Sequence, residues 1–404
     1  MRTLRLVSLI AAAAFALPTA LSGADAPIAK PEAPVTTLAA LKPEVEALID
    51  QAQTWLLAQQ QADGSFMPGD KFTLGITALA VDALCTGPKA IPGNDPRITK
   101  ALDLLLAQQQ PDGGFYKPDE GLGNYVTSLT LMALSSAKQG SKEQIEKAQG
   151  YLFGLQNATD TSIALGGIGY GSKGAGHEDL SNTGMAVDAL RRSGVPATDP
   201  RLQKALQFIS RCQNLSSTND LPWAKAGDSD GGAVYSPEES KSAGSWTPPD
   251  ATKAVEANPP TKLASYGSMT YAMISSYVAM DLKPNDQRVK AALDWVKRNY
   301  RFDVNPGMVG DKDKQRQGLF YYHMLAAKTL DLLDQGPMEL ADGKQVDWRI
   351  DLFNAIRSES TAVKLEDGKA AVMWINNAER WGENIPHLNA GYQIRALKRI
   401  AASL

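Results

Sequence analysis

The stretch Gln108-Gln109-Gln110-Pro111-Asp112-Gly113-Gly114-Phe115-Tyr116-Lys117-Pro118 recurs along most of the 404-residue chain. An earlier copy, Gln-Gln-Gln-Ala-Asp-Gly-Ser-Phe-Met-Pro, occupies residues 59–68, and weaker copies follow at 155–170 and 212–235. The glycines of the four copies are Gly64, Gly113, Gly167 and Gly231. They are separated by a drifting period of roughly fifty residues, which indicates a repeat architecture with loop insertions.

Two different helical patterns flank each copy. Before the second copy, apolar residues follow the i, i+3, i+4, i+7 spacing of an amphipathic helix at Ile98, Ala101, Leu102, Leu105 and Leu106. After it, residues 125–134 carry no charge and no continuous polar stripe, so this helix must be covered on most sides. We therefore expect an outer helix followed by an inner helix in every repeat.

The outer and inner patterns alternate six times, at about 43–85, 95–138, 141–193, 198–280, 284–334 and 346–403. This alternation predicts an all-α fold, an (α/α)6 toroid in which inner helices surround an axis and outer helices cover them. A kelch propeller has a similar period, but the alternating apolar strands that it needs are missing. No sheet is expected.

The N-terminal residues have the features of a secretory signal. Arg2 and Arg5 precede an apolar run over 6–17, and the small residues Ser22-Gly23-Ala24 follow. We expect a signal peptide at 1–24, a flexible tether at 25–40 and a toroid domain at 41–404. The protein would be exported, periplasmic or secreted, and the mature chain would have no transmembrane segment. The long segment 213–262, rich in Ser, Lys, Pro and Gly, is either a mobile surface excursion or a flap over the ring.

The composition excludes some partners. With 43% hydrophobic residues, 21% charged residues and a net charge of −3, the composition indicates neither a nucleic-acid surface nor a basic membrane patch. A protein partner is left open. The two cysteines, Cys85 and Cys212, are too few for a disulfide framework, and whether they pair is also left open.

The Gln-rich helix ends, the Asp-Gly-aromatic turns and the six helix pairs together resemble the toroidal squalene–hopene cyclases and the catalytic subunits of protein prenyltransferases. The C-terminal third is most similar to exported bacterial proteins with prenyltransferase or squalene-cyclase repeats, through 266–272, 305–308, 317–323, Asp347-Trp348-Arg349 and Arg380-Trp381. The resemblance implies a central cavity for a long apolar ligand such as an isoprenoid.

The reactive motifs of these families are incomplete. The cyclases protonate an alkene with the middle aspartate of Asp-x-Asp-Asp-Thr-Ala, and the matching segment here is Asp179-Leu180-Ser181-Asn182-Thr183-Gly184. Ser181 has no acidic proton near neutral pH. The prenyltransferases hold zinc with an aspartate, a cysteine and a histidine. Only the histidine has a counterpart here, His323, and the aspartate and the cysteine have none. We expect no metal and no cofactor, and whether the chain is an enzyme is left open.

Candidate site residues come from the starts of the inner helices, which converge at one end of a toroid. If the ring is an enzyme, His323 would be the general acid or base, and Asp179 would orient it or hold a developing positive charge. Arg380 would hold an anionic head group. The ligand-binding candidates are Tyr125, Asn182, Tyr266, Ser268, Tyr322, Arg380 and Trp381.

Two other functions remain in view. The chain could be a non-catalytic interaction scaffold of the cell envelope, with a filled centre and a binding surface at 213–262. It could also act on glycans, because (α/α) toroids of that kind place paired carboxylates and stacking aromatics at the mouth of the ring. The candidates for that chemistry are Glu178, Asp179, Glu379, Glu383, Tyr266, Trp374 and Trp381.

Overall fold

The computed structural model describes residues 33–69, 72–171, 177–246 and 262–404. Two units separate at residue 34, Met1–Pro34 and Val35–Leu404. The predicted signal peptide lies outside the described residues, so it stays a prediction. The description below concerns the second unit.

The described residues are mainly helical. The long helices are α1 (Leu38–Ala58), α2 (Thr73–Cys85), α3 (Pro96–Leu106), α4 (Gly123–Ala137), α5 (Lys142–Gly154), α6 (Leu180–Arg192), α7 (Pro200–Arg211), α9 (Gly267–Ala279), α10 (Gln287–Arg298), α12 (Leu319–Leu332), α13 (Trp348–Ser358) and α14 (Pro386–Ala402). Short helices are α8 (Pro222–Ala226), α11 (Lys312–Arg316) and the 3-10 turn η1 (Arg380–Gly382). The strands are β1 (Met338–Glu339), β2 (Gln345–Val346), β3 (Ser360–Lys364) and β4 (Ala370–Trp374).

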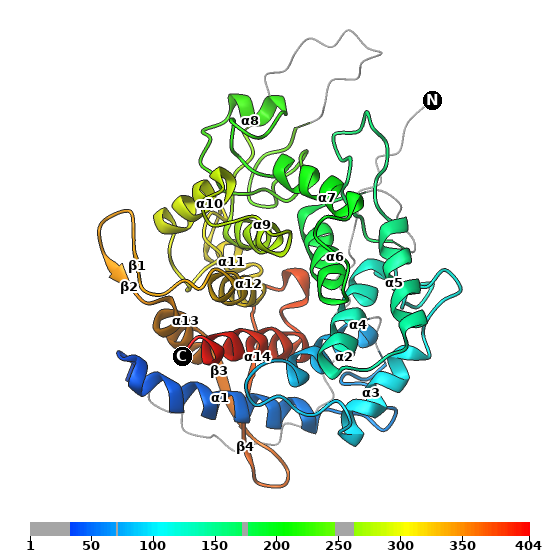
Figure 1. Ribbon diagram of the computed structural model, residues 1–404. Helices are drawn as coiled ribbons and strands as arrows, with labels where there is room; N and C mark the ends of the chain where they lie inside the picture. Colours follow the sequence, from blue (N-terminus) through cyan, green and yellow to red (C-terminus); the bar gives the residue numbers. More distant parts are fainter. Residues whose placement is uncertain (1–32, 70–71, 172–176, 247–261) are drawn as a thin grey trace. The chain divides into compact units, whose positions relative to one another are not determined.

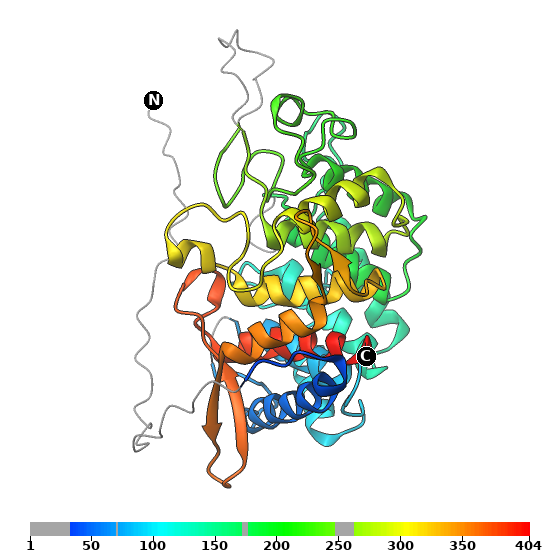
Figure 2. The same ribbon diagram turned by 90° about the vertical axis from the view of Figure 1, so that its left-hand side faces the viewer.

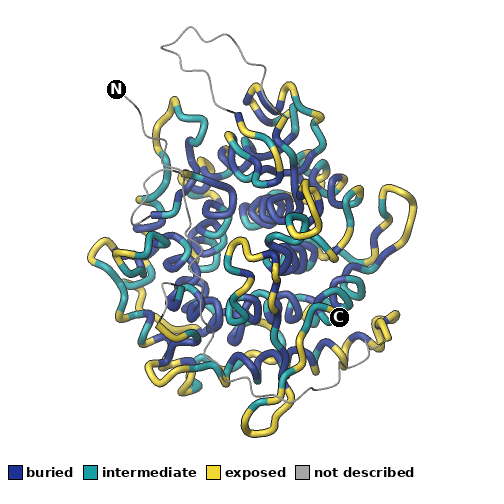
Figure 3. The backbone as a smooth tube through the Cα atoms, turned by 180° about the vertical axis from the view of Figure 1, so that it is seen from behind, coloured by how far each residue is buried: buried dark blue, intermediate teal, exposed yellow. Residues whose placement is uncertain are grey.

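The expected inner helices pack against one another in succession. Helix α2 contacts α4, α4 contacts α6, α6 contacts α9, α9 contacts α12, α12 contacts α14, and α14 returns to α2 (Figure 1). These helices are buried along nearly their whole length (Figure 3). By contrast, α3 buries only the stripe Ile98, Ala101, Leu102 and Leu105 that its sequence predicts. The distinction between covered and one-sided helices is therefore confirmed.

The recurring turn joins neighbouring outer helices by the same contacts in four places. In each, a glutamine Nε2 donates to the carbonyl of the turn glycine and to a carbonyl in the first turn of the next outer helix, at 2.8–3.0 Å. The glutamines are Gln60, Gln109, Gln156 and Gln213. A backbone N–H that follows each turn donates to an inner-helix threonine, namely Thr77, Thr127, Thr183 or Thr270. The repeated motif thus connects each turn to both helical layers.

The turn glycines have positive φ and lie against backbone. Their φ values are 96° at Gly64, 93° at Gly113, 86° at Gly166 and 84° at Gly231. In the third turn the glycine with positive φ is Gly166, one residue before Gly167, which the sequence comparison had aligned with the other three. A Cβ on Gly166 would lie 1.9 Å from the Lys204 carbonyl oxygen, so only glycine allows this approach.

The expectation of no sheet is wrong in two places. Strands β1 and β2 form a short antiparallel pair, and β3 pairs with β4 in the register Thr361↔Met373. Strand β4 packs on α1 and α14, and Figure 2 shows the β3–β4 hairpin beside α1. The Trp374 Nε1 donates to the Ile356 carbonyl at 2.9 Å, which fixes the hairpin to α13. Both hairpins turn at Asp-Gly pairs, a hairpin signal that the repeat interpretation obscured.

The predicted tether ends earlier than residue 40. Helix α1 begins at Leu38, and the Thr37 side chain caps it by accepting from the Ala40 N–H at 3.3 Å. The buried Val35 exchanges two hydrogen bonds with the Asn354 side chain, at 3.0 and 2.8 Å. Residues 35–40 therefore belong to the folded unit.

The described part of the 213–262 segment is packed. It contains α8 and isolated bridges such as Gln213↔Ala233 and Glu239↔Ser245. The buried Ser242 hydroxyl donates to the Gly307 carbonyl, and Lys314 Nζ donates to the Ser242 carbonyl at 2.9 Å. Residues 247–261 lie outside the described residues, so the choice between a surface excursion and a flap remains a matter of prediction.

Candidate functional site

Asp179 is the N-cap of α6 and is buried, with only 1% of its surface exposed. Its Oδ1 accepts from the Asn182 N–H at 2.8 Å, and its Oδ2 accepts from Asn182 Nδ2 at 2.7 Å and from the Tyr235 hydroxyl at 2.8 Å. Burial raises the pKa of the carboxyl to about 6, although these hydrogen bonds oppose the rise. Asp179 is therefore a carboxyl group that titrates close to neutrality.

Five tyrosines surround this carboxyl and form what we call the tyrosine cluster: Tyr125, Tyr170, Tyr235, Tyr266 and Tyr321. Burial raises the pKa of all five hydroxyls, and the charge of Asp179 raises it further. The Tyr170 and Tyr235 hydroxyls lie 2.8 Å apart, so a chain of hydroxyls leads to Asp179. The cluster offers both aromatic faces and hydroxyl groups to a ligand.

A second chain of hydroxyls runs between three of the inner helices. The Tyr125 hydroxyl donates to Ser181 Oγ at 2.9 Å, and Ser181 Oγ lies 3.0 Å from the Tyr321 hydroxyl. These residues come from α4, α6 and α12, three different inner helices. Ser181, which stands where the cyclases have their acid, is thus a hydrogen-bonding bridge.

The space beneath this bridge is small. A cavity of about 20 Å³ is lined by Ser181, Gly184, Met185, Asp188, Ala272, Ser275, Ser276, Tyr321, Met324, Leu325, Lys328 and Arg395. A void of this size holds about one water molecule. Among the described residues this cavity is therefore too small for the long apolar ligand that the sequence led us to expect, because methionine, tyrosine and charged side chains occupy the space between the inner helices.

No hydrogen bond joins His323 to Asp179 in the described part of the chain, and its role as a general acid or base stays a prediction. Its Nε2 lies 2.7 Å from the Phe302 carbonyl and its Nδ1 lies 3.2 Å from Gln393 Nε2, so both ring nitrogens are engaged. Burial lowers the pKa of the ring to about 4. Because successive residues of an α-helix point about 100° apart, Tyr321 can face the axis while His323 points away from it.

Tyr322 and Ser268 also stand apart from Asp179. The Tyr322 hydroxyl donates to the Arg301 carbonyl at 2.7 Å, and its ring lies 5.6 Å from that of Tyr271. Ser268 exchanges hydrogen bonds with the Asn305 side chain, whose Oδ1 accepts the Ser268 N–H at 2.9 Å and whose Nδ2 donates to Ser268 Oγ at 3.1 Å. Both predicted ligand-binding residues serve the local structure.

Arg380 and Trp381 are exposed beside the tyrosine cluster. The positive charge of Arg380 lowers the pKa of Tyr266, whereas burial and the charge of Asp179 raise it. Its guanidinium carbon lies 4.5 Å from the centre of the Trp381 ring, and Nη1 donates to Gln317 Oε1 at 3.2 Å. Trp381 is 41% exposed and has a φ of 60°, an uncommon conformation for a bulky residue. Of the predicted residues, the structure thus gathers Asp179, Asn182, Tyr125, Tyr266 and Arg380, with Trp381 next to them.

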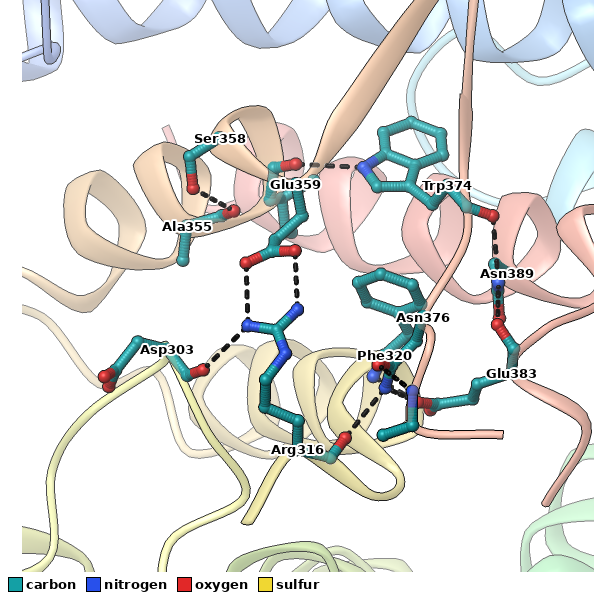
Figure 4. Close-up of polar contacts among 12 residues, drawn as sticks. Asp303, Arg316, Phe320, Ala355, Ser358, Glu359, Trp374, Asn376, Glu383 and Asn389 are labelled. Atoms are coloured by element: carbon teal, nitrogen blue, oxygen red, sulfur yellow. Dashed lines mark hydrogen bonds and ion pairs between the residues drawn. The ribbon is translucent and has the colours of Figure 1, made fainter. Parts of the chain in front are cut away.

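Glu383 is a second buried carboxyl, at the start of α12 (Figure 4). Its Oε1 accepts from the Phe320 and Tyr321 N–H groups, both at 2.9 Å, and its Oε2 accepts from Asn376 Nδ2 at 2.7 Å. Burial raises its pKa to about 7. Gly318, the N-cap residue of α12, has no side chain for this role. Glu383, which is more than sixty residues away in the sequence, therefore caps the N-terminus of α12 in place of Gly318.

Three of the four carboxylates proposed for glycan chemistry, Glu178, Asp179 and Glu383, are engaged in local contacts. Glu383 caps α12, and Glu178 Oε1 accepts from Asn157 Nδ2 at 3.0 Å. Trp374 is buried, so it presents no face for a sugar to stack on. These contacts weaken the glycan hypothesis.

The described residues contain no group of three or more His, Cys, Asp and Glu side chains placed to hold a metal ion. Cys85 and Cys212 are both buried and free. None of the described helices combines the length and apolar character that crossing a membrane requires.

Three members of the site were missed as ligand-binding candidates in the sequence: Tyr170, Tyr235 and Tyr321. Tyr170 and Tyr235 each follow a turn glycine, Gly166 or Gly231, by four residues. Comparison of successive copies of the turn would have singled them out. Tyr321 carries no such signal, because only the rotation of α12 decides that it faces the axis.

No family model and no curated protein matches the sequence. The structure is similar to that of the type II terpene cyclase MstE from Scytonema. A variant of that enzyme in complex with its product, merosterolic acid A, matches with a TM-score of 0.54 and 13% identity over 91% of this chain and 100% of the other. Another variant, in complex with the substrate geranylgeranyl dihydroxybenzoate, matches with a TM-score of 0.55 and 12% identity over the same shares. This chain has a terpene cyclase-like fold.

Proposed function

We propose that the chain is an exported (α/α)6 toroid that binds a long apolar, isoprenoid or lipid-like ligand at the end of the ring where the inner helices begin. The observation that carries this proposal is the buried, titratable Asp179 within the tyrosine cluster. The terpene cyclase-like fold supports it, because the similar enzyme MstE binds geranylgeranyl dihydroxybenzoate. The closed succession of inner helices from α2 to α14 supports the six-pair ring.

Binding fits this site better than alkene protonation. Both Asp179 oxygens accept hydrogen bonds, and a carboxyl whose pKa is raised to about 6 is a weaker acid than an ordinary one. Ser181 supplies no acid in its place. Because its pKa is raised to about 6, Asp179 also gives up its charge more readily than an ordinary aspartate when an apolar molecule covers the site. The ligand would therefore be held without cyclisation by the known route.

A ligand must open the hydroxyl bridge to reach the axis. Tyr125 and Tyr321 meet at Ser181, so rotation of either tyrosine would uncover the space below. Arg380 and Trp381 are exposed beside the cluster and would hold a polar or anionic head group. The apolar part of the ligand would then lie against the tyrosine rings.

The closed axis favours a second candidate, a non-catalytic interaction scaffold of the cell envelope. Its binding surface would include the packed segment 213–246. A scaffold requires no cavity, so the cavity of about 20 Å³ is no obstacle to it.

The first test is to identify bound lipid. The full chain would be purified from the exported fraction, extracted and analysed by mass spectrometry, and binding of geranylgeraniol would be followed by intrinsic fluorescence. We expect an isoprenoid or lipid in the extract and saturable binding. Ser181→Phe, which fills the space between Tyr125 and Tyr321, should weaken binding at least about tenfold.

Ser358→Phe on the exposed face of α13 is the matched control and should bind like the wild type. Circular dichroism would show that both variants are folded. An extract without lipid, together with no binding of geranylgeraniol by the wild type, would reject the ligand proposal and leave the scaffold.

A further inference from the structure

A buried cluster of charges lies toward the C-terminal ends of the inner helices, away from the tyrosine cluster. Asp82 of α2 is fully buried and pairs with Arg192 of α6, whose Nη2 lies 2.6 Å from its Oδ1. Arg395 of α14 approaches the same carboxylate, with Nε 3.2 Å from Oδ2. Asp188 of α6 pairs with Lys328 of α12 at 2.9 Å. Four inner helices are thus joined by ion pairs.

The charges in this cluster do not balance. Three cationic side chains, Arg192, Lys328 and Arg395, share two carboxylates, Asp82 and Asp188, which leaves this group of described residues with a net charge of +1. The neighbouring pair of Arg399 and Asp331, at 2.8 Å, is neutral by itself and does not change this count. An uncompensated buried charge is costly unless an opposite charge or water accompanies it.

One of the three cations, Arg395, has a buried N–H donor without a hydrogen-bond partner among the residues that the structure describes, and Arg395 lines a cavity. Arg395 Nη1 is buried and has no hydrogen-bond partner in the described part of the chain. Arg395 and Lys328 both line the axial cavity of about 20 Å³. They also line a second void of about 10 Å³, together with Met324 and Arg399. The partial negative charge at the C-terminal ends of the inner helices favours cations here. Even so, no acceptor among the described residues takes a hydrogen bond from Arg395 Nη1.

We propose that the axial cavity binds one monatomic anion of chloride size, held by Arg395 and Lys328. The small volume favours a monatomic ion over sulfate, phosphate or a carboxylate, and the Asp188 carboxylate, which also lines the cavity, is neutralised by its ion pair with Lys328. The anion completes the charge balance of four helices. The cavity also touches Ser181 and Tyr321, so a ligand that opened the hydroxyl bridge would meet the anion, but the anion requires only Arg395 and Lys328 and does not depend on the ligand proposed at Asp179.

The test compares halide and large-anion salts at constant ionic strength. A ligand that binds only the folded state raises Tm in a saturable way, so chloride and bromide should raise Tm by about 1–3 °C relative to gluconate, which is too large for the cavity. Arg395→Gln should abolish the difference between the salts. Arg201→Gln, at an exposed ion pair on α7, is the matched control and should preserve it.

A direct measurement on the wild-type protein covers the case in which Arg395→Gln does not fold. Crystals grown in bromide should show an anomalous peak in the cavity between Arg395 and Lys328. A peak there supports the proposal. Water in the cavity without bromide, together with equal Tm values in chloride and gluconate, would overturn it.

Discussion

Asp179 has an environment that makes stability depend on pH. Its pKa of about 6 lies above its ordinary value of 3.8, because burial disfavours the charged form. Between these values the folded protein keeps a proton that the unfolded chain has released. The contribution of Asp179 to the free energy of unfolding is therefore complete below pH 3.8 and is lost as the pH rises through 6.

Asp179→Asn should remove this dependence. The wild type should lose up to about 3 kcal/mol relative to the variant between pH 4 and pH 6. Urea unfolding of both proteins at several pH values within that range provides the measurement. Glu383, whose pKa is also raised, contributes a slope of the same sign to both proteins and cancels in the comparison. Parallel stability curves would show that Asp179 is ionised in the folded state at these pH values.

Four copies of one turn hold the outer helices at a fixed spacing. The glutamine gives two hydrogen bonds, and the glycine lets the turn approach the backbone of the next outer helix. The motif is therefore structural, in agreement with its repetition. This also explains why the repeat predicts the fold more clearly than the function.

Gly166→Ala should be strongly destabilising. The new Cβ would lie 1.9 Å from the Lys204 carbonyl oxygen, and φ is 86°. Strain of this kind together with the displacement of α7 should cost about 2–4 kcal/mol. Gly154→Ala is the control, because Gly154 is the last residue of α5 and a Cβ added there would have no other atom within 4 Å. It should change stability by less than about 1 kcal/mol, in the stabilising direction. Thermal unfolding of the two variants would decide, and equal Tm values would contradict the role given to the turn.

Helices from opposite ends of the chain share one core. Helix α14 packs against both α12 and α2, and the buried residues of the folded unit form one hydrophobic cluster. Gly391 of α14 lies against Leu79 of α2, where an added Cβ would be 2.7 Å from Leu79 Cδ2. This contact joins the last inner helix to the first.

Gly391→Val should therefore separate α14 from α2. We expect a loss of about 1–3 kcal/mol and faster hydrogen exchange in both helices, although they lie at opposite ends of the sequence. Hydrogen–deuterium exchange with mass spectrometry would show the pattern, and Gly150→Ala, at a position with no atom close to the added Cβ, is the control. Faster exchange confined to α14 would mean that the two helices are not coupled.

The sequence by itself determined the helical repeat. The apolar spacing of α3, the uncharged inner segments and the Asp-Gly turns are local patterns, and local patterns fix helix type and burial. The Asp-Pro pairs that precede α3 and α7 are local signals of the same kind, and in the structure the Asp95 and Asp199 carboxylates each accept from the N–H two residues later at 2.9 Å. The hairpins were missed because their Asp-Gly turns resembled those of the repeat.

The site depended on the tertiary structure. Sequence reasoning placed Asp179, Tyr266 and Arg380 near one end of the axis, because inner helices begin there. It could not tell that Tyr321 faces Ser181 while His323 faces Phe302, since a rotation of α12 by about half a turn would put His323 where Tyr321 is. It also could not show that the axial cavity is small or that Arg395 Nη1 has no hydrogen-bond partner among the described residues. Those properties depend on how side chains from different helices fill a common space, and no single segment of the sequence encodes that.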